Sequence, residues 1–234
     1  VSFQTLREKL KAFVPKPPAA QLASLEQIPA QSPRVRTTHR FDARESKMMY
    51  DPHGAPLIQR LTEPAAIQDL RTTLRLIDQD KLPVSATTLL PSKAAMTLLC
   101  SLLREQDFFD LTGKANNWDP EIGPMKGFSW PLLVQAAKLA GGRNGKLLLT
   151  KLGPSALEAP PAQTLRNIWN AWLANKIIDE FSRIDTIKGQ KGKGGRSMTP
   201  PAERRLAIQA ALAECPVGRW VEAGEFSRYM RAGG

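Results

Sequence analysis

The sequence predicts a mainly helical α+β fold with small β-hairpins, and two observations indicate it. Nineteen prolines and sixteen glycines divide the 234 residues into short elements, which argues against one large sheet. Between residues 128 and 157 the apolar residues change from helical to extended spacing. The order helix, glycine turn, strand and turn in that stretch is typical of the second half of a winged helix-turn-helix. The alternative is a helix–strand unit in another kind of α+β domain.

The helix of this stretch is predicted over residues 130–140, where apolar residues recur at helical spacing. Pro131 suits the first turn of a helix, because the N–H that it lacks has no partner there. The glycine pair at 141–142 is expected to end the helix. An extended run over residues 146–150 and a turn at 153–154 then complete the pattern.

The first half of the same unit is predicted upstream. Residues 62–80 form a helix with Thr62 as its N-cap and with apolar residues at spacings of 3, 4 and 3. Residues 81–85 are short and extended, and a second helix begins at residues 91–92. The resulting order α, β, α, α, β over residues 62–157 predicts one complete winged-helix domain.

The N-terminal part, residues 1–61, has a different character. Residues 2–13 have an amphipathic pattern and predict a small helix. Residues 15–33 are rich in proline and predict a linker. The basic segment 34–47 is interpreted as either a strand and turn or an extended arm.

Residues 158–198 are predicted to be a helical connector followed by a loop. The helix covers residues 162–174, and its Trp169 and Trp172 are expected to belong to a core. Residues 186–198 have four cations, four glycines and no acid, so a mobile loop that trypsin cuts first is expected.

Residues 199–234 repeat the start of the predicted domain. A helix over 202–213, an extended piece over 216–221 and a helix over 222–230 are expected. We interpret them as a partial second winged helix, and we expect the native chain to continue beyond Gly234 to complete it. The alternative is that these elements pack on the body of a complete protein.

The charge of the chain predicts a polyanionic partner. Thirty-three basic residues against 22 acidic residues give a net charge of +11 and a sequence pI near 10.0, and nucleic acid is the usual partner of such proteins. The alternative is charge that serves solubility alone. No apolar run is long enough for a transmembrane helix, and the N-terminus lacks the apolar core of a secretion signal. Cys100 and Cys215 are interpreted as free thiols of a cytoplasmic protein.

The residues that catalysis or metal binding requires are sparse. His39 and His53 with two distant cysteines do not predict a zinc site, and no GxSxG motif occurs. Residues 189–194 have the glycine spacing of a phosphate loop, but Gly–Arg–Ser follows where Gly–Lys–Ser/Thr is needed. We therefore expect no catalytic residue, no metal and no cofactor, and a protein that is not an enzyme.

A resemblance to a known family rests on four segments of the sequence. They read LRLIDQDKLPVSATTLLPSKAAMTLLCSLL, SWPLLVQAAKLAG, LLLTKLGPSAL and ALAECPVGRWVEAGEFSRYMR. Together they resemble the tandem winged-helix regions of bacterial proteins that are related to the module associated with XPB-type helicases. The resemblance covers about residues 62–234 and implies DNA binding or protein docking beside a larger machine. The helicase motor of that family is not present in this sequence, so no catalytic residue is carried over.

The leading hypothesis is a non-catalytic winged-helix module of a larger protein or assembly that binds double-stranded DNA. In such a module the third helix enters the major groove and the wing contacts the neighbouring backbone. Phosphate contacts should dominate because that helix has few polar positions. The predicted nucleic-acid-binding residues are Lys126, Ser129, Gln135, Lys138, Arg143, Lys146 and Lys151, with Lys188, Lys191, Lys193 and Arg196 from the loop.

Two alternatives remain open at the level of sequence. The first is a protein-interaction scaffold built from winged helices, which the apolar character of helix 130–140 favours. The second is a sequence-specific transcription regulator. The leading hypothesis predicts an affinity for duplex DNA that falls steeply with salt and depends little on sequence.

Overall fold

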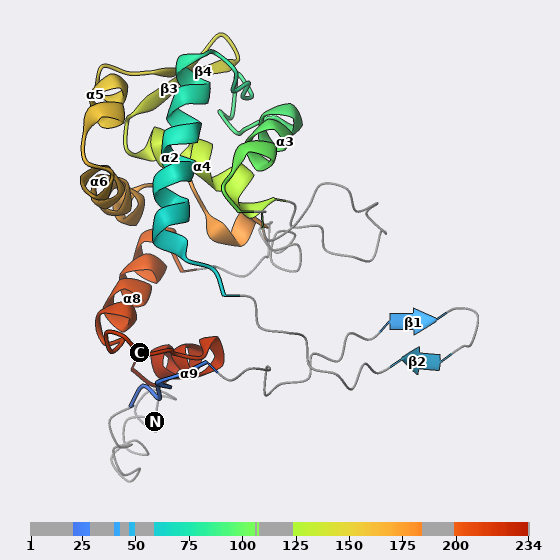
Figure 1. Cartoon of the computed structure of the whole chain (residues 1–234), viewed down its shortest axis with the longest axis vertical. Coiled ribbons are helices and arrows are strands. Elements are labelled where there is room, and N and C mark those ends of the chain that lie inside the picture. The colour runs from blue at the N-terminus through green and yellow to red at the C-terminus, as the bar shows by residue number, and fades with distance from the viewer. Residues whose placement is uncertain are drawn as a thin grey trace, which may run out of the picture. The chain divides into compact units, whose positions relative to one another are not determined.

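The computed structural model describes residues 21–28, 40–42, 47–49, 59–105, 107, 124–183 and 199–233. The predicted helix 2–13 and the predicted loop 186–198 lie outside these residues. The chain forms two compact units, one of residues 1–58 with 207–234 and one of residues 59–206 (Figure 1).

The unit of residues 59–206 is mainly helical with a small antiparallel sheet, which confirms the predicted α+β class. Its elements are α2 (Thr62–Asp78), α3 (Lys93–Leu102), α4 (Met125–Ala136), β3 (Ala140–Arg143), β4 (Lys146–Leu149), α5 (Leu152–Glu158), α6 (Pro161–Ala174), the 3-10 helix η1 (Glu180–Arg183) and the start of α8 (Pro201–Ala213). Ser92 is the N-cap of α3 and accepts the Ala95 N–H at 3.1 Å, close to the start predicted at residues 91–92. The N-cap position of α2 is Leu61 and not Thr62.

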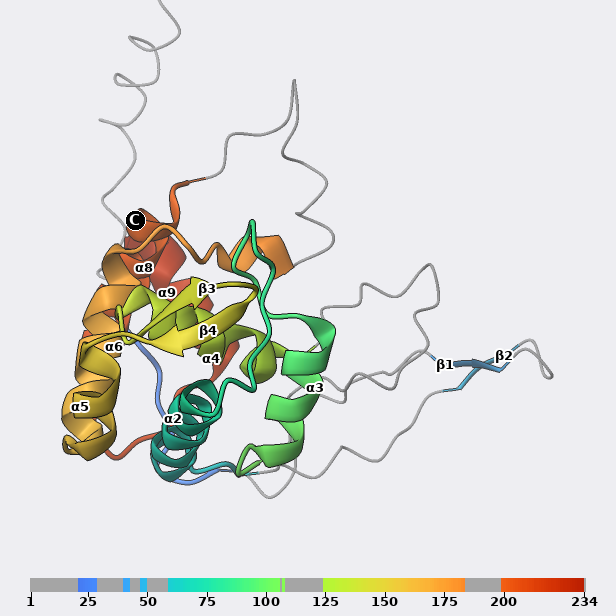
Figure 2. The same ribbon diagram turned by 90° about the horizontal axis from the view of Figure 1, so that it is seen from above.

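The sheet is a tight hairpin to which a third short segment adds. β3 and β4 pair antiparallel and are joined by Asn144 and Gly145, whose φ angles of 52° and 74° suit a two-residue hairpin turn. The Leu147 N–H donates to the Leu82 carbonyl at 3.0 Å, and the Val84 N–H donates to the Gly145 carbonyl at 2.8 Å. The extended segment predicted at 81–85 is therefore confirmed, and it lies beside β4 (Figure 2).

One core unites the helices and the hairpin of this unit. Leu74, Ile77, Leu99, Val134 and Leu147 have no exposed surface, and they come from α2, α3, α4 and β4. The predicted connector helix joins the same core, because α6 packs against α2, α4 and α5. Burial of apolar side chains from several elements in one cluster is what stabilises such a small unit.

Helix α4 begins five residues before the predicted start because a distant carboxylate caps it. Asp107 accepts the N–H groups of Met125 and Gly127 through its two oxygens, each at 2.9 Å. A carboxylate at this end also interacts favourably with the helix dipole. Pro131 consequently lies inside the helix and not in its first turn.

The end of α4 differs from the prediction for a local reason. Lys138 adopts a left-handed conformation with φ of 58°. Its N–H donates to the Gln135 carbonyl and the Leu139 N–H donates to the Val134 carbonyl, both at 2.9 Å, which is the Schellman pattern of a helix end. Lys138 therefore ends the helix, and the glycine pair at 141–142 belongs to β3.

Asp107 also holds a thiol in its protonated form. The Cys100 thiol donates to Asp107 Oδ2 at 3.7 Å. Burial, together with the negative charge and the hydrogen bond of Asp107, raises the pKa of Cys100 from 9.0 to about 11.

We therefore expect alkylation of Cys100 by iodoacetamide to be slow at pH 8 and to accelerate only as the pH approaches 11, because the thiolate is the reacting species. The raised pKa in the folded state also means that this thiol contributes stability below pH 9, which is lost as the pH rises to about 11. The rate is measured by mass spectrometry of the Cys100 peptide, with the urea-unfolded protein as the reference. A native rate profile that matches the unfolded profile contradicts this expectation.

The turn predicted at residues 153–154 lies instead inside α5. Thr150 precedes Lys151, the N-cap of this helix, and its Oγ1 accepts the Leu152 N–H at 3.2 Å while its carbonyl accepts the Gly153 N–H at 3.1 Å. Gly153 is buried against the base of the hairpin.

A buried arginine, which the sequence reasoning did not single out, joins α6 to the start of α8. Arg205 has a relative exposure of 1%. Its guanidinium donates to Glu180 Oε1 at 2.8 Å and to the carbonyls of Trp172, Asn175 and Ile178 at 2.6, 2.7 and 2.5 Å. The Trp172 carbonyl lies in the last turn of α6, and those of Asn175 and Ile178 follow the helix, so Arg205 supplies donors where the helical bond pattern ends.

The two tryptophans of α6 differ in their surroundings. Trp172 is half-buried, and its Nε1–H donates to Glu180 Oε1 at 2.9 Å. Trp169 is 37% exposed, so the prediction that it belongs to the core is wrong. Its ring contacts Trp172 at a centroid distance of 5.0 Å on the outside of the helix.

The other unit contains the hairpin β1 (Arg40–Asp42) and β2 (Lys47–Met49), the end of α8 and α9 (Ala223–Gly233). β1 pairs antiparallel with β2, which agrees with the strand predicted in the basic segment, whereas the residues between the two strands lie outside the described part of the chain. Leu25 and Trp220 exchange two backbone hydrogen bonds at 2.7 and 2.8 Å. Arg219 adds bonds from its guanidinium to Ser24 Oγ at 2.8 Å and to Glu26 Oε1 at 3.0 Å. The predicted extended piece 216–221 thus pairs, through Trp220, with a segment of the proline-rich linker.

Candidate nucleic-acid interface

Two cations lie directly opposite each other at the tip of the β3–β4 hairpin. Arg143 and Lys146 are partners in the strand register, and both are exposed. Opposed residues of an antiparallel pair project from the same face of the sheet, and like charges in this position destabilise the pair. On the other side of Lys146, Pro83 forms an isolated bridge with it. An anion bound at this tip would relieve the repulsion.

Two further cations lie at the base of the hairpin. Lys138 and Lys151 are both exposed, one just before β3 and one just after β4. Thr150 ties the two ends together, because its Oγ1 donates to the Lys138 carbonyl at 2.6 Å. The left-handed backbone of Lys138 costs about 1 kcal/mol relative to glycine, so this lysine occupies a site where glycine is more stable.

The segment that carries these four cations contains no acidic residue. Residues 124–157 include five cations and no acid. Within the described part of the chain, Lys138, Arg143, Lys146 and Lys151 form no ion pair. We call these four residues the hairpin cations. No carboxylate among the described residues pairs with them, so their positive charges are available to an anionic partner.

Lys126, a predicted phosphate contact, lies in an ion pair inside the fold. Its side chain is only 16% exposed, and Nζ lies 3.6 Å from Oδ2 of the buried Asp69. Nζ also donates to the Glu105 carbonyl at 3.4 Å. A buried carboxylate needs such a partner, because burial of an uncompensated charge is costly. Lys126 therefore neutralises Asp69 within the fold.

Gln135 is buried, and Ser129 is only partly exposed. Gln135 is 7% exposed, and its Nε2 donates to the carbonyls of Leu89 at 3.2 Å and Pro131 at 3.0 Å. This burial gives no support to the predicted contact of Gln135 with nucleic acid. Ser129 is half-buried and lines a pocket of about 290 Å³ between α2 and α4.

Helix α4 as a whole lacks an exposed face. Each of its 12 residues is buried or half-buried, because α2, α3 and α6 all pack against it. A recognition helix needs polar side chains that reach base edges in the major groove. The structure does not provide them on α4, so the hairpin cations are the part of the predicted site that it brings together at the surface. Lys188, Lys191, Lys193 and Arg196 lie outside the described residues.

Comparison with protein-family models, with curated proteins and with solved structures finds no match. Among the described residues, none of the helices has the length and apolar character needed to cross a membrane.

Proposed function

We propose that residues 62–157 form a winged-helix module. The order of its elements supports this assignment: α2, the segment 82–84, α3, α4 and the β3–β4 hairpin follow one another as in that fold. The pairing supports it as well, because segment 82–84 lies beside β4 and so connects the start of the unit to its wing.

We further propose that the module, as part of a larger protein or assembly, binds double-stranded DNA without catalysis through phosphate contacts. The observation that carries this proposal is the cluster of four exposed hairpin cations on a segment that has no acid. Arg143 can donate two parallel hydrogen bonds to one phosphate, while the three lysines act as point charges. Contacts of this kind position a protein on DNA but do not read its sequence.

A protein-interaction scaffold is the second candidate. The burial of α4 favours it, because a winged helix without an exposed third helix lacks the element that reads the major groove. The two candidates differ in their expected response to salt, and the following experiment separates them.

Fluorescence anisotropy with a labelled duplex of random sequence tests DNA binding. If the four hairpin cations each neutralise one phosphate, the log of the binding constant should fall against the log of salt concentration with a slope of about 3.6. Replacement of Arg143 and Lys146 by alanine should lower this slope by about 1.8 and weaken binding equally for scrambled sequences.

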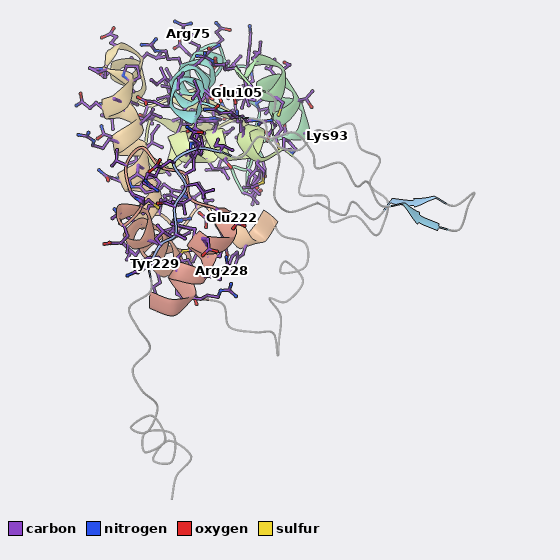
Figure 3. All side chains as sticks on the ribbon, turned by 60° about the horizontal axis from the view of Figure 1, so that its bottom comes forward. Arg75, Lys93, Glu105, Glu222, Arg228 and Tyr229 are labelled. Atoms are coloured by element: carbon purple, nitrogen blue, oxygen red, sulfur yellow. The ribbon has the colours of Figure 1, made fainter. Side chains whose placement is uncertain are left out.

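The matched control replaces Lys93 and Arg166 by alanine. Both are exposed cations, on α3 and α6, and their loss changes the net charge by the same amount (Lys93 is labelled in Figure 3). This control should keep the slope of the original protein. Absence of binding at low salt, an equal loss in both double variants, or strong preference for one sequence would each overturn the proposal.

A further inference from the structure

A second basic surface lies on α2, away from the hairpin cations. A groove of about 520 Å³ runs along the helix and is bounded by Arg104, which follows α3. Arg71 and Arg75 line one part of this groove, and Pro64 and Ile67 line another. Figure 3 shows Arg75 projecting from the outer end of α2.

The three arginines of the groove are exposed, and within the described residues they form no ion pair. None of the residues that line the groove is acidic. Arg71 and Arg75 are four residues apart on one helix face, a spacing at which like charges destabilise a helix. The cluster therefore gains stability when an anion binds between its members.

The position of Arg104 is determined by the fold. Its backbone N–H donates to Oδ1 of the buried Asp69 at 2.9 Å, which holds the end of α3 against α2. The core-facing stripe of α2 includes Leu70, Leu74 and Ile77, whereas the groove is lined by the opposite stripe. The groove contains none of the hairpin cations, so the two basic surfaces are separate.

We propose that this groove binds an acidic segment of a partner protein, with carboxylates on the arginines and an apolar side chain against Pro64 and Ile67. All three cations are arginines, whose planar guanidinium donates two parallel bonds to a carboxylate and tolerates loss of water at an interface. A duplex backbone supplies anions but no apolar group for the part of the groove formed by Pro64 and Ile67. The combination of charge and apolar surface therefore favours a peptide over DNA.

The probe is a fluorescein-labelled peptide of glutamates with two leucines at helical spacing, titrated against the full chain and followed by anisotropy. We expect it to bind, and we expect the same peptide with glutamine in place of each glutamate not to bind. Replacement of Arg71 and Arg75 by glutamine should weaken binding about tenfold. Replacement of both by lysine should recover only part of the loss, because lysine keeps the charge but not the paired donors.

The variants distinguish a failure of the proposed peptide binding from a failure of the proposed DNA binding. Arg143 and Lys146 changed to alanine should leave peptide affinity unaltered, and Lys93 and Arg166 changed together to glutamine control for the loss of two charges. Equal binding of the glutamate and glutamine peptides overturns the inference. So does a result in which the Arg71 and Arg75 changes weaken duplex binding but not peptide binding, because the groove would then serve DNA. Thermal unfolding confirms that each variant is folded.

Discussion

Replacement of Arg205 by methionine is expected to lower the free energy of unfolding of the 59–206 unit by about 3 kcal/mol. The guanidinium is 1% exposed and serves one carboxylate and three carbonyls, all of which lose a donor in the variant. Glu180 Oε1 keeps the Trp172 Nε1–H and the Trp172 carbonyl keeps the Asn175 N–H, so the desolvation cost falls mainly on the carbonyls of Asn175 and Ile178. The expected loss lies at the lower end of the range for broken buried ion pairs, because the Glu180 side chain is 40% exposed and can recover water.

Urea unfolding followed by tryptophan fluorescence measures this loss, since the Arg205 guanidinium lies 5.0 Å from the Trp172 ring centroid. Arg205 changed to lysine should be intermediate, because one ammonium cannot satisfy four acceptors in the arginine geometry. Arg166 changed to methionine is the control: it is exposed on α6, and its effect should stay within about 0.5 kcal/mol. A midpoint for the Arg205 variant that coincides with this control would show that the buried arginine contributes no stability.

The second large effect is expected for Gly153 changed to alanine, which should cost about 2 kcal/mol. A Cβ atom at Gly153 would lie 2.8 Å from the Leu139 carbonyl oxygen and 2.8 Å from Leu149 Cβ. The carbonyl cannot retreat freely, because it accepts the Thr150 N–H at 3.0 Å. Part of the cost is offset by the better helix propensity of alanine within α5.

Gly141 changed to alanine is the matched control, because a Cβ atom there meets nothing within 4 Å. It should leave the stability unchanged or raise it slightly, since alanine restricts the unfolded chain more than glycine does. Thermal melts of the two variants, recorded side by side, measure the difference. If alanine lowers the melting temperature equally little at both positions, α5 does not pack closely on the base of the hairpin at Gly153.

The elements that the sequence predicts well are those whose signals are local. α2, α6 and α8 have continuous apolar stripes, and their observed bounds agree with the prediction to within two residues. The observed bounds of α4 differ from the predicted bounds for two reasons. The start of the helix depends on Asp107, a carboxylate 18 residues before Met125, and its end depends on the left-handed Lys138. Neither signal belongs to the periodic pattern of the helix itself.

For the candidate site too, features with local sequence signals could be predicted, and features that depend on distant partners could not. The hairpin cations could be predicted because a tight turn with charged ends is exposed whatever surrounds it. Lys126 and Gln135 could not be excluded, because their partners Asp69 and Leu89 are distant in sequence. In the sequence Arg205 looks like any other arginine of a helix. It is a buried donor only because the end of α6 packs against it, with the carbonyls of Trp172 and Asn175 as acceptors.

The left-handed conformation of Lys138 has a consequence for engineering this protein toward higher thermostability. Rules for helix ends recommend glycine at this position, and the exchange should raise the melting temperature by relieving the backbone. The same exchange removes one hairpin cation, so a screen that scores only heat resistance would select against the proposed attachment to DNA. Thermal stability and the proposed DNA affinity therefore make opposite demands on Lys138. Variants of this chain should be ranked on both properties.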